Sequence, residues 1–253
     1  MASPLALRFG SSAVFAGVVA VWWATSHAGW VSRVFVPTPE ATLASLKEGF
    51  AAGGELAAFT LATTVRMLQG WLLASLAGIV LGAFIGVSAT ARACLQPTLE
   101  FIRPLPASAL LPLAISMFGL SPTMVLFVVA FGAMWPVLLA TVHGYAAVDP
   151  RLQEVARCLQ LKRSAFVWKV GLPHALPDIL AGMRLSLTVA LIVSIVGEMI
   201  ASQAGLGLAI LLAARAFHAS ELFAGVVLLG AIGFVSNTLL SQAERTLLKW
   251  QSP

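Results

Sequence analysis

The chain has 253 residues, of which 59% are hydrophobic and only 10% are charged. Soluble domains average about 45–50% apolar and about 25% charged residues. The composition therefore excludes an ordinary soluble enzyme, and its recurring stretches without charge indicate a polytopic membrane protein. The net charge of +5 does not point to nucleic acid as a partner, because basic residues of membrane proteins gather on cytoplasmic loops.

The first apolar stretch covers residues 12–28 and resembles both a signal-peptide core and a first transmembrane helix. A retained helix is favoured, because Trp22 and Trp23 suit an interfacial belt and the cleavage pattern that follows is poor. Residues 27–66 are mixed in composition. They predict a loop that carries a short interfacial helix and leads into the next span.

Residues 70–87 carry no charge and contain a stripe of small side chains on one helical face. The members of this stripe recur every four positions: Gly70, Ala74, Gly78, Gly82 and Gly86. Small residues let helix backbones approach closely where lipid offers no hydrophobic drive for association. The stripe predicts a packing surface, either against another span of the same bundle or against a second copy of the chain.

The next apolar stretch, residues 105–120, is short and contains Pro106 and Pro112. As a straight helix it would reach only about 24 Å, which is less than the roughly 30 Å hydrocarbon core. We expect an irregular span, and broken helices at membrane depth often line a pathway. Pro112, Met117 and Phe118 are the candidate pathway residues of this segment; a kinked packing helix is the alternative.

Three further apolar stretches, residues 123–142, 179–201 and 222–240, complete an expected set of six spans. The predicted fold is an all-α membrane bundle of six transmembrane helices, forming a single domain over residues 1–253. Glu198 lies about a turn inside the outer end of the fifth span. It is predicted either to bond to the Gly205–Gly207 turn or to line an outer gate.

Lysine and arginine residues divide unequally between the two sides of this topology. With the N-terminus inside, the outer set is Arg33, Lys47, Arg66 and Arg215. The inner set is Arg8, Arg92, Arg103, Arg151, Arg157, Lys162, Arg163, Lys169, Arg184, Arg245 and Lys249. This positive-inside bias predicts that both termini and the long polar loop are cytoplasmic.

The chain offers few groups for chemistry of its own. It contains no G-x-x-x-x-G-K-[ST] phosphate loop, no nucleophile motif and no metal-ligand spacing, so neither an enzyme nor a bound cofactor is expected. Cys94 and Cys158 lie too far apart in sequence for a C-x-x-C motif and are expected to be reduced thiols. The spans also lack the chains of carboxylate and histidine residues that form proton relays.

The polar loop between the fourth and fifth spans, residues 145–178, is the most informative segment. Asp149 followed by Pro150 is typical of a helix start, and this helix is predicted to run through Gln160. Ser164 is predicted to cap a second short helix that ends at residues 171–173. The loop is either a solvated connection or a docking element, in which Ala156 is small enough for close approach to a partner.

A family resemblance lies in the same loop. Glu154, Val155, Ala156, Gln160, Val170, Gly171, Leu172 and Pro173 resemble, at matching spacing, the E-A-A-x3-G-x9-I-x-L-P coupling signature of ABC importer permeases. Three positions depart from it: Val155 for alanine, Gln160 for glycine and Val170 for isoleucine. Other runs, such as 103–119 and 172–177, are similar to the nitrate, sulfonate, taurine and bicarbonate group of these permeases.

The resemblance implies a type I importer permease in the bacterial inner membrane that works as a homodimer. It further implies two partner ATPase subunits, which would bind the ATP and magnesium, and an extracytoplasmic binding protein that delivers a small anion. Related permeases for pyrimidine-type or other small organic solutes share much of the pattern. A secondary transporter is a further alternative, but the sequence offers no internal repeat for it.

Overall fold

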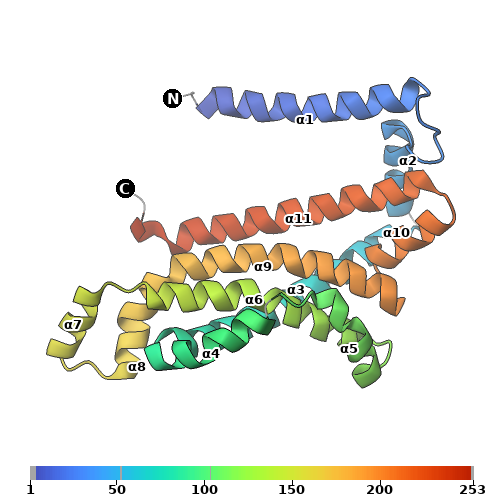
Figure 1. Ribbon diagram of the computed structural model, residues 1–253. Coiled ribbons are helices and arrows are strands. Elements are labelled where there is room, and N and C mark those ends of the chain that lie inside the picture. Colours follow the sequence, from blue (N-terminus) through green and yellow to red (C-terminus); the bar gives the residue numbers. More distant parts are fainter. Residues whose placement is uncertain (1–3, 52, 103, 252–253) are drawn as a thin grey trace.

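The computed structural model describes residues 4–251, except residues 52 and 103, and all regular elements among these residues are helical (Figure 1). The centre is formed by α3 (Leu56–Gly86), α6 (Pro122–Ala146) and α9 (Leu172–Ala201), which pack along one another. The last long helix, α11 (Ala219–Leu247), lies beside α9. The expected all-α fold is confirmed.

Shorter helices surround this centre. They are α1 (Pro4–His27), α2 (Pro39–Phe50), α4 (Ala89–Ile102), α5 (Leu111–Phe118), α7 (Pro150–Cys158), α8 (Arg163–Phe166) and α10 (Leu206–Arg215). Single turns lie at Ala107–Leu110, Val167–Gly171 and Lys249–Gln251. Helices α7 and α8 project from one end of the bundle, and both chain ends lie towards that end (Figure 1).

Four helices in the described part of the chain are long and apolar enough to cross a membrane: α3, α6, α11 and the continuous helix Ser164–Ala201. A fifth crossing is possible if α4 and the segment Ala107–Phe118, bent by 80°, act as one broken span. The expected irregularity of residues 105–120 is therefore present. A sixth span at α1, whose apolar part covers Ala13–His27, stays a prediction.

The small-residue stripe explains why α3 and α6 lie so close together. A Cβ atom added at Gly78 would lie 2.9 Å from the Cβ of Val137, and one at Gly82 would lie 2.6 Å from the Cβ of Thr141. Gly70, Ala74 and Gly86 are buried in the same interface region. The stripe thus contacts α6 of the same chain, which is the first of its two predicted partners.

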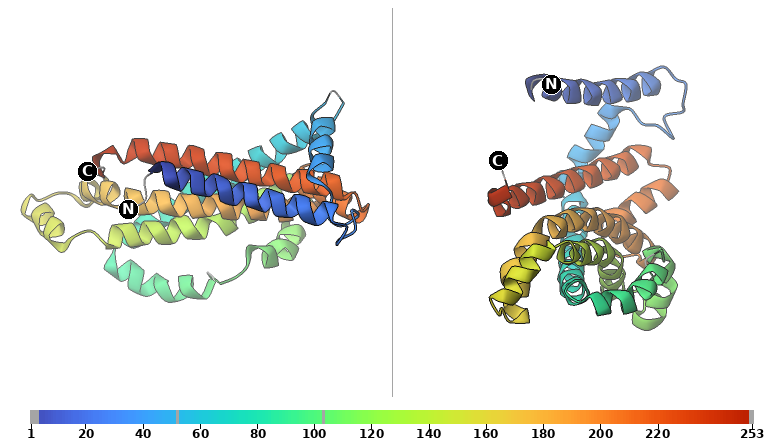
Figure 2. Two further views of the ribbon diagram at one scale, coloured as in Figure 1. Left: turned by 90° about the horizontal axis from the view of Figure 1, so that it is seen from above. Right: turned by 60° about the vertical axis from the view of Figure 1, so that its left-hand side comes forward.

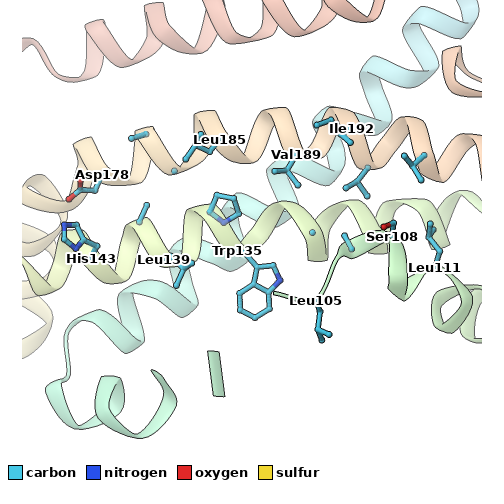
Figure 3. Close-up of a pocket in the computed structure, with 18 residues that line it drawn as sticks. Leu105, Ser108, Leu111, Trp135, Leu139, His143, Asp178, Leu185, Val189 and Ile192 are labelled. Atoms are coloured by element: carbon cyan, nitrogen blue, oxygen red, sulfur yellow. The ribbon is translucent and has the colours of Figure 1, made fainter. Parts of the chain in front are cut away.

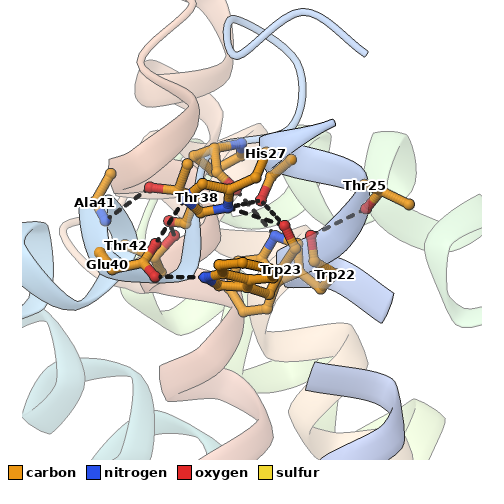
Figure 4. Close-up of polar contacts among 10 residues, drawn as sticks. Trp22, Trp23, Thr25, His27, Thr38, Glu40, Ala41 and Thr42 are labelled. Atoms are coloured by element: carbon orange, nitrogen blue, oxygen red, sulfur yellow. Dashed lines mark hydrogen bonds and ion pairs between the residues drawn. The ribbon is translucent and has the colours of Figure 1, made fainter. Parts of the chain in front are cut away.

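Helix α1 is attached mainly at one end and lies apart from the central helices (Figure 2). The Trp22 indole donates to the Pro37 carbonyl at 2.9 Å, and Trp23 donates to Glu40 at the same distance (Figure 4). His27 stacks on the Trp23 ring with centroids 4.5 Å apart. The helix N-terminus around Glu40 and these contacts hold the pKa of this exposed carboxyl below its ordinary value.

Candidate coupling loop and groove

The polar loop begins with the capped helix that its sequence predicts. The Asp149 carboxylate accepts a hydrogen bond from the Arg151 backbone N–H at 2.8 Å, and Pro150 occupies the first helical turn. Helix α7 ends at Cys158, two residues before the predicted end. The N–H of Leu161 then bonds to the Ala156 carbonyl at 3.0 Å and closes the helix.

Gln160 supplies the left-handed residue of this turn. Its φ of 50° lies in the region that glycine adopts without strain and other residues adopt rarely. The turn therefore has a glycine-type backbone although glutamine replaces the signature glycine. The substitution changes the residue and keeps the geometry.

Helix α7 exposes apolar side chains at the end of the bundle. Val155 is 53% exposed, Leu159 is 67% exposed, and Glu154 lies on the surface between them in sequence. Ala156, in contrast, is only 5% exposed, because it faces the chain itself. The expectation that Ala156 is the point of close approach to a partner is therefore wrong; Val155 and Leu159 present the apolar surface.

The second helix of the loop does not end at residues 171–173 as predicted. Helix α8 passes through the π-helical turn Val167–Gly171 directly into α9, where the Leu172 N–H bonds to the Val167 carbonyl. Pro173 is accommodated in the first turn of α9, where its missing N–H leaves no partner unsatisfied. Ser164 lies within this helix and does not cap it.

Gly171 connects this continuous helix to α6. A Cβ atom there would lie 2.7 Å from the Tyr145 ring, so only glycine allows this approach. Gly144 on α6 is equally close to Ala175 on α9, with 2.8 Å to its Cα. The loop is therefore joined rigidly to the two central helices, and Val170 and Leu172 lie half-buried at this junction.

A cavity of about 690 Å³ opens between α6, α9 and the segment that precedes α5 (Figure 3). Its walls are mainly aliphatic. The lining residues are Leu105, Ala107, Ser108, Leu111, Gly132, Trp135, Pro136, Leu139, Ala140, His143, Asp178, Ala181, Gly182, Leu185, Val189, Ile192, Val193 and Val196. We call this cavity the groove.

The groove is lined by other residues than those predicted for a pathway. Pro112, Met117 and Phe118 are exposed and do not line it, because the chain turns before them and presents positions 105–111 instead. Polar groups are few. His143 and Asp178 lie at one end, and the Trp135 indole extends from α6 towards the segment that carries Leu105 (Figure 3).

Glu198 lies away from the groove in a buried polar cluster. It pairs with Arg66 and accepts hydrogen bonds from the Thr63 hydroxyl at 3.0 Å and the Gly207 N–H at 2.9 Å. Arg66 also donates to the Ala204 carbonyl at 3.3 Å. These bonds tie α3 and α9 to the start of α10, which matches the structural alternative rather than an outer gate.

The hydroxyl of Thr63 completes this cluster, because it accepts a bond from the Leu206 N–H at 2.9 Å. A Cβ atom at Gly205 would lie 2.5 Å from the Glu198 carboxylate, so the chain approaches the carboxylate as closely as glycine permits. Among the side chains that the structure describes, no group of three or more His, Cys, Asp or Glu residues is placed to hold a metal ion.

Known proteins resemble this chain over most of its length. A protein of Bacillus subtilis named as an aliphatic sulfonates transport permease, SsuC, is 34% identical, with 93% of this chain and 85% of the relative covered. The taurine transport system permease protein TauC of Escherichia coli is 30% identical over 96% and 89%. The bicarbonate transport system permease protein CmpB of Synechococcus elongatus is 29% identical over 75% and 69%.

The fold has a counterpart among solved structures. A chain of the MetNI methionine ABC transporter, in an inward-facing conformation, matches with a TM-score of 0.63 at 20% identity, covering 74% of this chain and 92% of that one. The family described as "Binding-protein-dependent transport system inner membrane component" matches residues 74–249. This chain belongs to that family and is a multi-pass inner-membrane permease subunit of the ABC importer type.

Proposed function

We propose that this permease works in an ATP-driven, binding-protein-dependent importer and forms the pathway for a small anion of the sulfonate, taurine or nitrate type. The observation that carries the proposal is the α7 surface, where Val155 and Leu159 are exposed beyond the bundle on a helix joined rigidly to α9. Exposed apolar side chains on a short solvated helix favour a protein partner. The chain itself has no phosphate loop, so this partner supplies the ATPase.

The helical continuity from α8 through α9 provides a path for coupling. A rigid displacement of α7 and α8 by the partner is transmitted through the Val167–Gly171 turn to α9, which forms one wall of the groove. The contact between Gly171 and Tyr145 carries the same displacement to α6, which forms the facing wall. Movement of the loop would in this way change the width of the groove.

The proposed assembly contains two copies of this chain, two ATPase subunits and a binding protein on the outer side. The groove is open along one face of a single chain, so a second copy across it would enclose a pathway. The positive-inside bias places α7 and both termini in the cytoplasm. The sulfonate, taurine and bicarbonate permeases among the relatives support a small anion as the solute.

Substitution of Val155 tests the docking surface. We expect Val155→Glu to insert normally and to lose co-purification with the ATPase subunits and solute-dependent ATP hydrolysis in proteoliposomes, because a charge replaces an apolar contact. Val34→Glu is the matched control, since Val34 is also exposed but lies in the α1–α2 connection at the other end of the bundle. Unchanged ATPase attachment in Val155→Glu would show that docking lies elsewhere.

Cys158 tests the orientation of the same surface. It is an exposed free cysteine at the end of α7. We expect a membrane-impermeant thiol reagent to label it in inverted vesicles and to leave it unlabelled in intact cells, with Cys94→Ser as the background. Labelling in intact cells would place α7 outside and contradict the proposed docking of a cytoplasmic ATPase.

A further inference from the structure

One buried hydrogen-bond donor faces the groove without a partner. The Trp135 side chain is 9% exposed, and its Nε1 atom has no acceptor among the residues that the structure describes. Other indoles are satisfied: Trp22 donates to Pro37 and Trp71 to the Met183 carbonyl, each at 2.9 Å. An unmade bond of this kind costs about 1–3 kcal/mol and calls for a specific explanation.

The position of Trp135 supplies that explanation. Of the buried side-chain polar atoms without a partner in the described residues, its Nε1 is the one that belongs to the groove lining. Figure 3 shows the indole reaching from α6 across the groove. Its orientation is fixed by an edge-on contact with Phe131, with ring centroids 5.7 Å apart. The donor is thus held in place for an acceptor that enters the groove.

The remaining lining indicates which acceptor fits. No lysine or arginine lines the described groove, so an inorganic oxyanion would meet one N–H donor and aliphatic walls, which is a costly exchange for its hydration shell. Asp178 at one end repels a negative head group from that end. Leu139, Val189 and Ile192 provide apolar surface for a hydrocarbon body. A volume of about 690 Å³ admits such a solute together with water.

We propose that the groove is a selectivity site for organic acids with an alkyl body, and that Trp135 Nε1 donates to an oxygen of their oxyanion head. Alkanesulfonates have this chemistry, whereas nitrate and bicarbonate lack the alkyl body. The inference rests on the proposed function in one respect, that the groove lies on the import pathway. It adds a specificity-determining residue to the permease itself, separate from any selection by the binding protein.

A binding measurement on the wild-type chain tests the alkyl part. The full chain in lipid nanodiscs is titrated with methanesulfonate, butanesulfonate, hexanesulfonate and nitrate. We expect affinity to rise two- to fourfold per methylene, fourfold being the value for complete burial at about 0.8 kcal/mol. Nitrate is expected to bind more weakly than methanesulfonate. Equal binding of nitrate and hexanesulfonate would overturn the assignment of an organic solute.

A conservative substitution tests the donor. Trp135→Phe keeps an aromatic ring in place and removes only the indole N–H. We expect it to weaken binding of every alkanesulfonate about tenfold, the effect of one hydrogen bond, and to leave the increase per methylene unchanged. Trp30→Phe is the control, because Trp30 is exposed in the loop after α1. Unchanged butanesulfonate affinity in Trp135→Phe would remove Trp135 from the site.

Two further outcomes separate this inference from the proposed function. If alkanesulfonates do not bind, and Leu139→Cys chains cross-link to each other quantitatively, the groove is filled by the second copy and the inference fails while import stands. If binding follows the expected pattern but the assembled complex takes up solute without ATP hydrolysis, the proposed function fails and the site stands.

Discussion

The α3–α6–α9 centre and the α7–α8 loop use apolar side chains in opposite ways. In the centre, Gly82 and Thr141 fit so closely that a single Cβ would collide, and each residue is matched to a neighbour in the same chain. In the loop, Val155 and Leu159 have no such neighbour and remain exposed. Close internal fit therefore marks residues that stabilise the permease, and exposed apolar side chains on a rigid element mark residues available to a partner.

The strongest test of this contrast is the buried ion pair at the far end of the centre. Glu198→Ala leaves the Arg66 guanidinium without its carboxylate and removes the acceptor of the Gly207 N–H. Removing one partner of a buried pair costs about 3–5 kcal/mol. We expect loss of folded, monodisperse protein in detergent, and partial recovery in the double variant with Arg66→Met, because the unpaired charge is then absent.

The control for Glu198 is a second ion pair that is more accessible. Arg184 pairs with Glu244 between α9 and α11, with side chains 41% and 23% exposed. Because water screens such pairs, we expect Glu244→Ala to cost about 1 kcal/mol or less. If Glu198→Ala is as stable as Glu244→Ala and reduces uptake alone, Glu198 has the gate role after all.

A smaller effect is expected from overpacking the stripe. Gly82→Ala places a methyl group 2.6 Å from Thr141 Cβ and 2.8 Å from the Leu138 carbonyl, and strain of this kind costs about 1–3 kcal/mol. Gly230→Ala in α11 is the matched control, since no atom lies within 4 Å of an added Cβ there. We expect thermal unfolding in nanodiscs to shift downward for Gly82→Ala and to stay level or rise for Gly230→Ala.

The sequence was sufficient for features that depend on local order along the chain. The cap at Asp149 needs only the residue and the proline that follows it, and the stripe from Gly70 to Gly86 needs only helical periodicity. The position of the irregular segment likewise follows from its prolines and its length. Each of these signals is contained within one turn or one helix.

Features that depend on the packing of distant segments were beyond the sequence pattern. Arg66 lies 132 residues from Glu198, and no periodicity links the two. The helix passes Pro173 without a break because a π turn precedes it, which residue types alone do not reveal. The groove lining was assigned to residues 112–118 instead of 105–111, because the direction of a bent segment depends on the helices that receive it.

The smallest expected effect concerns the strained turn of the coupling loop. Gln160 holds a φ of 50°, which costs a residue with a Cβ about 1–2 kcal/mol relative to glycine. Gln160→Gly removes that strain, and the greater freedom of glycine in the unfolded chain offsets about 0.5–1 kcal/mol of the gain. The net stabilisation of about 0.5–1 kcal/mol is local to the end of α7. It should slow amide exchange of Leu161, whose N–H bonds to Ala156 across the turn, by roughly threefold. Gln160→Ala keeps the Cβ and should show no slowing, so equal protection in the two variants would mean that the turn carries no backbone strain.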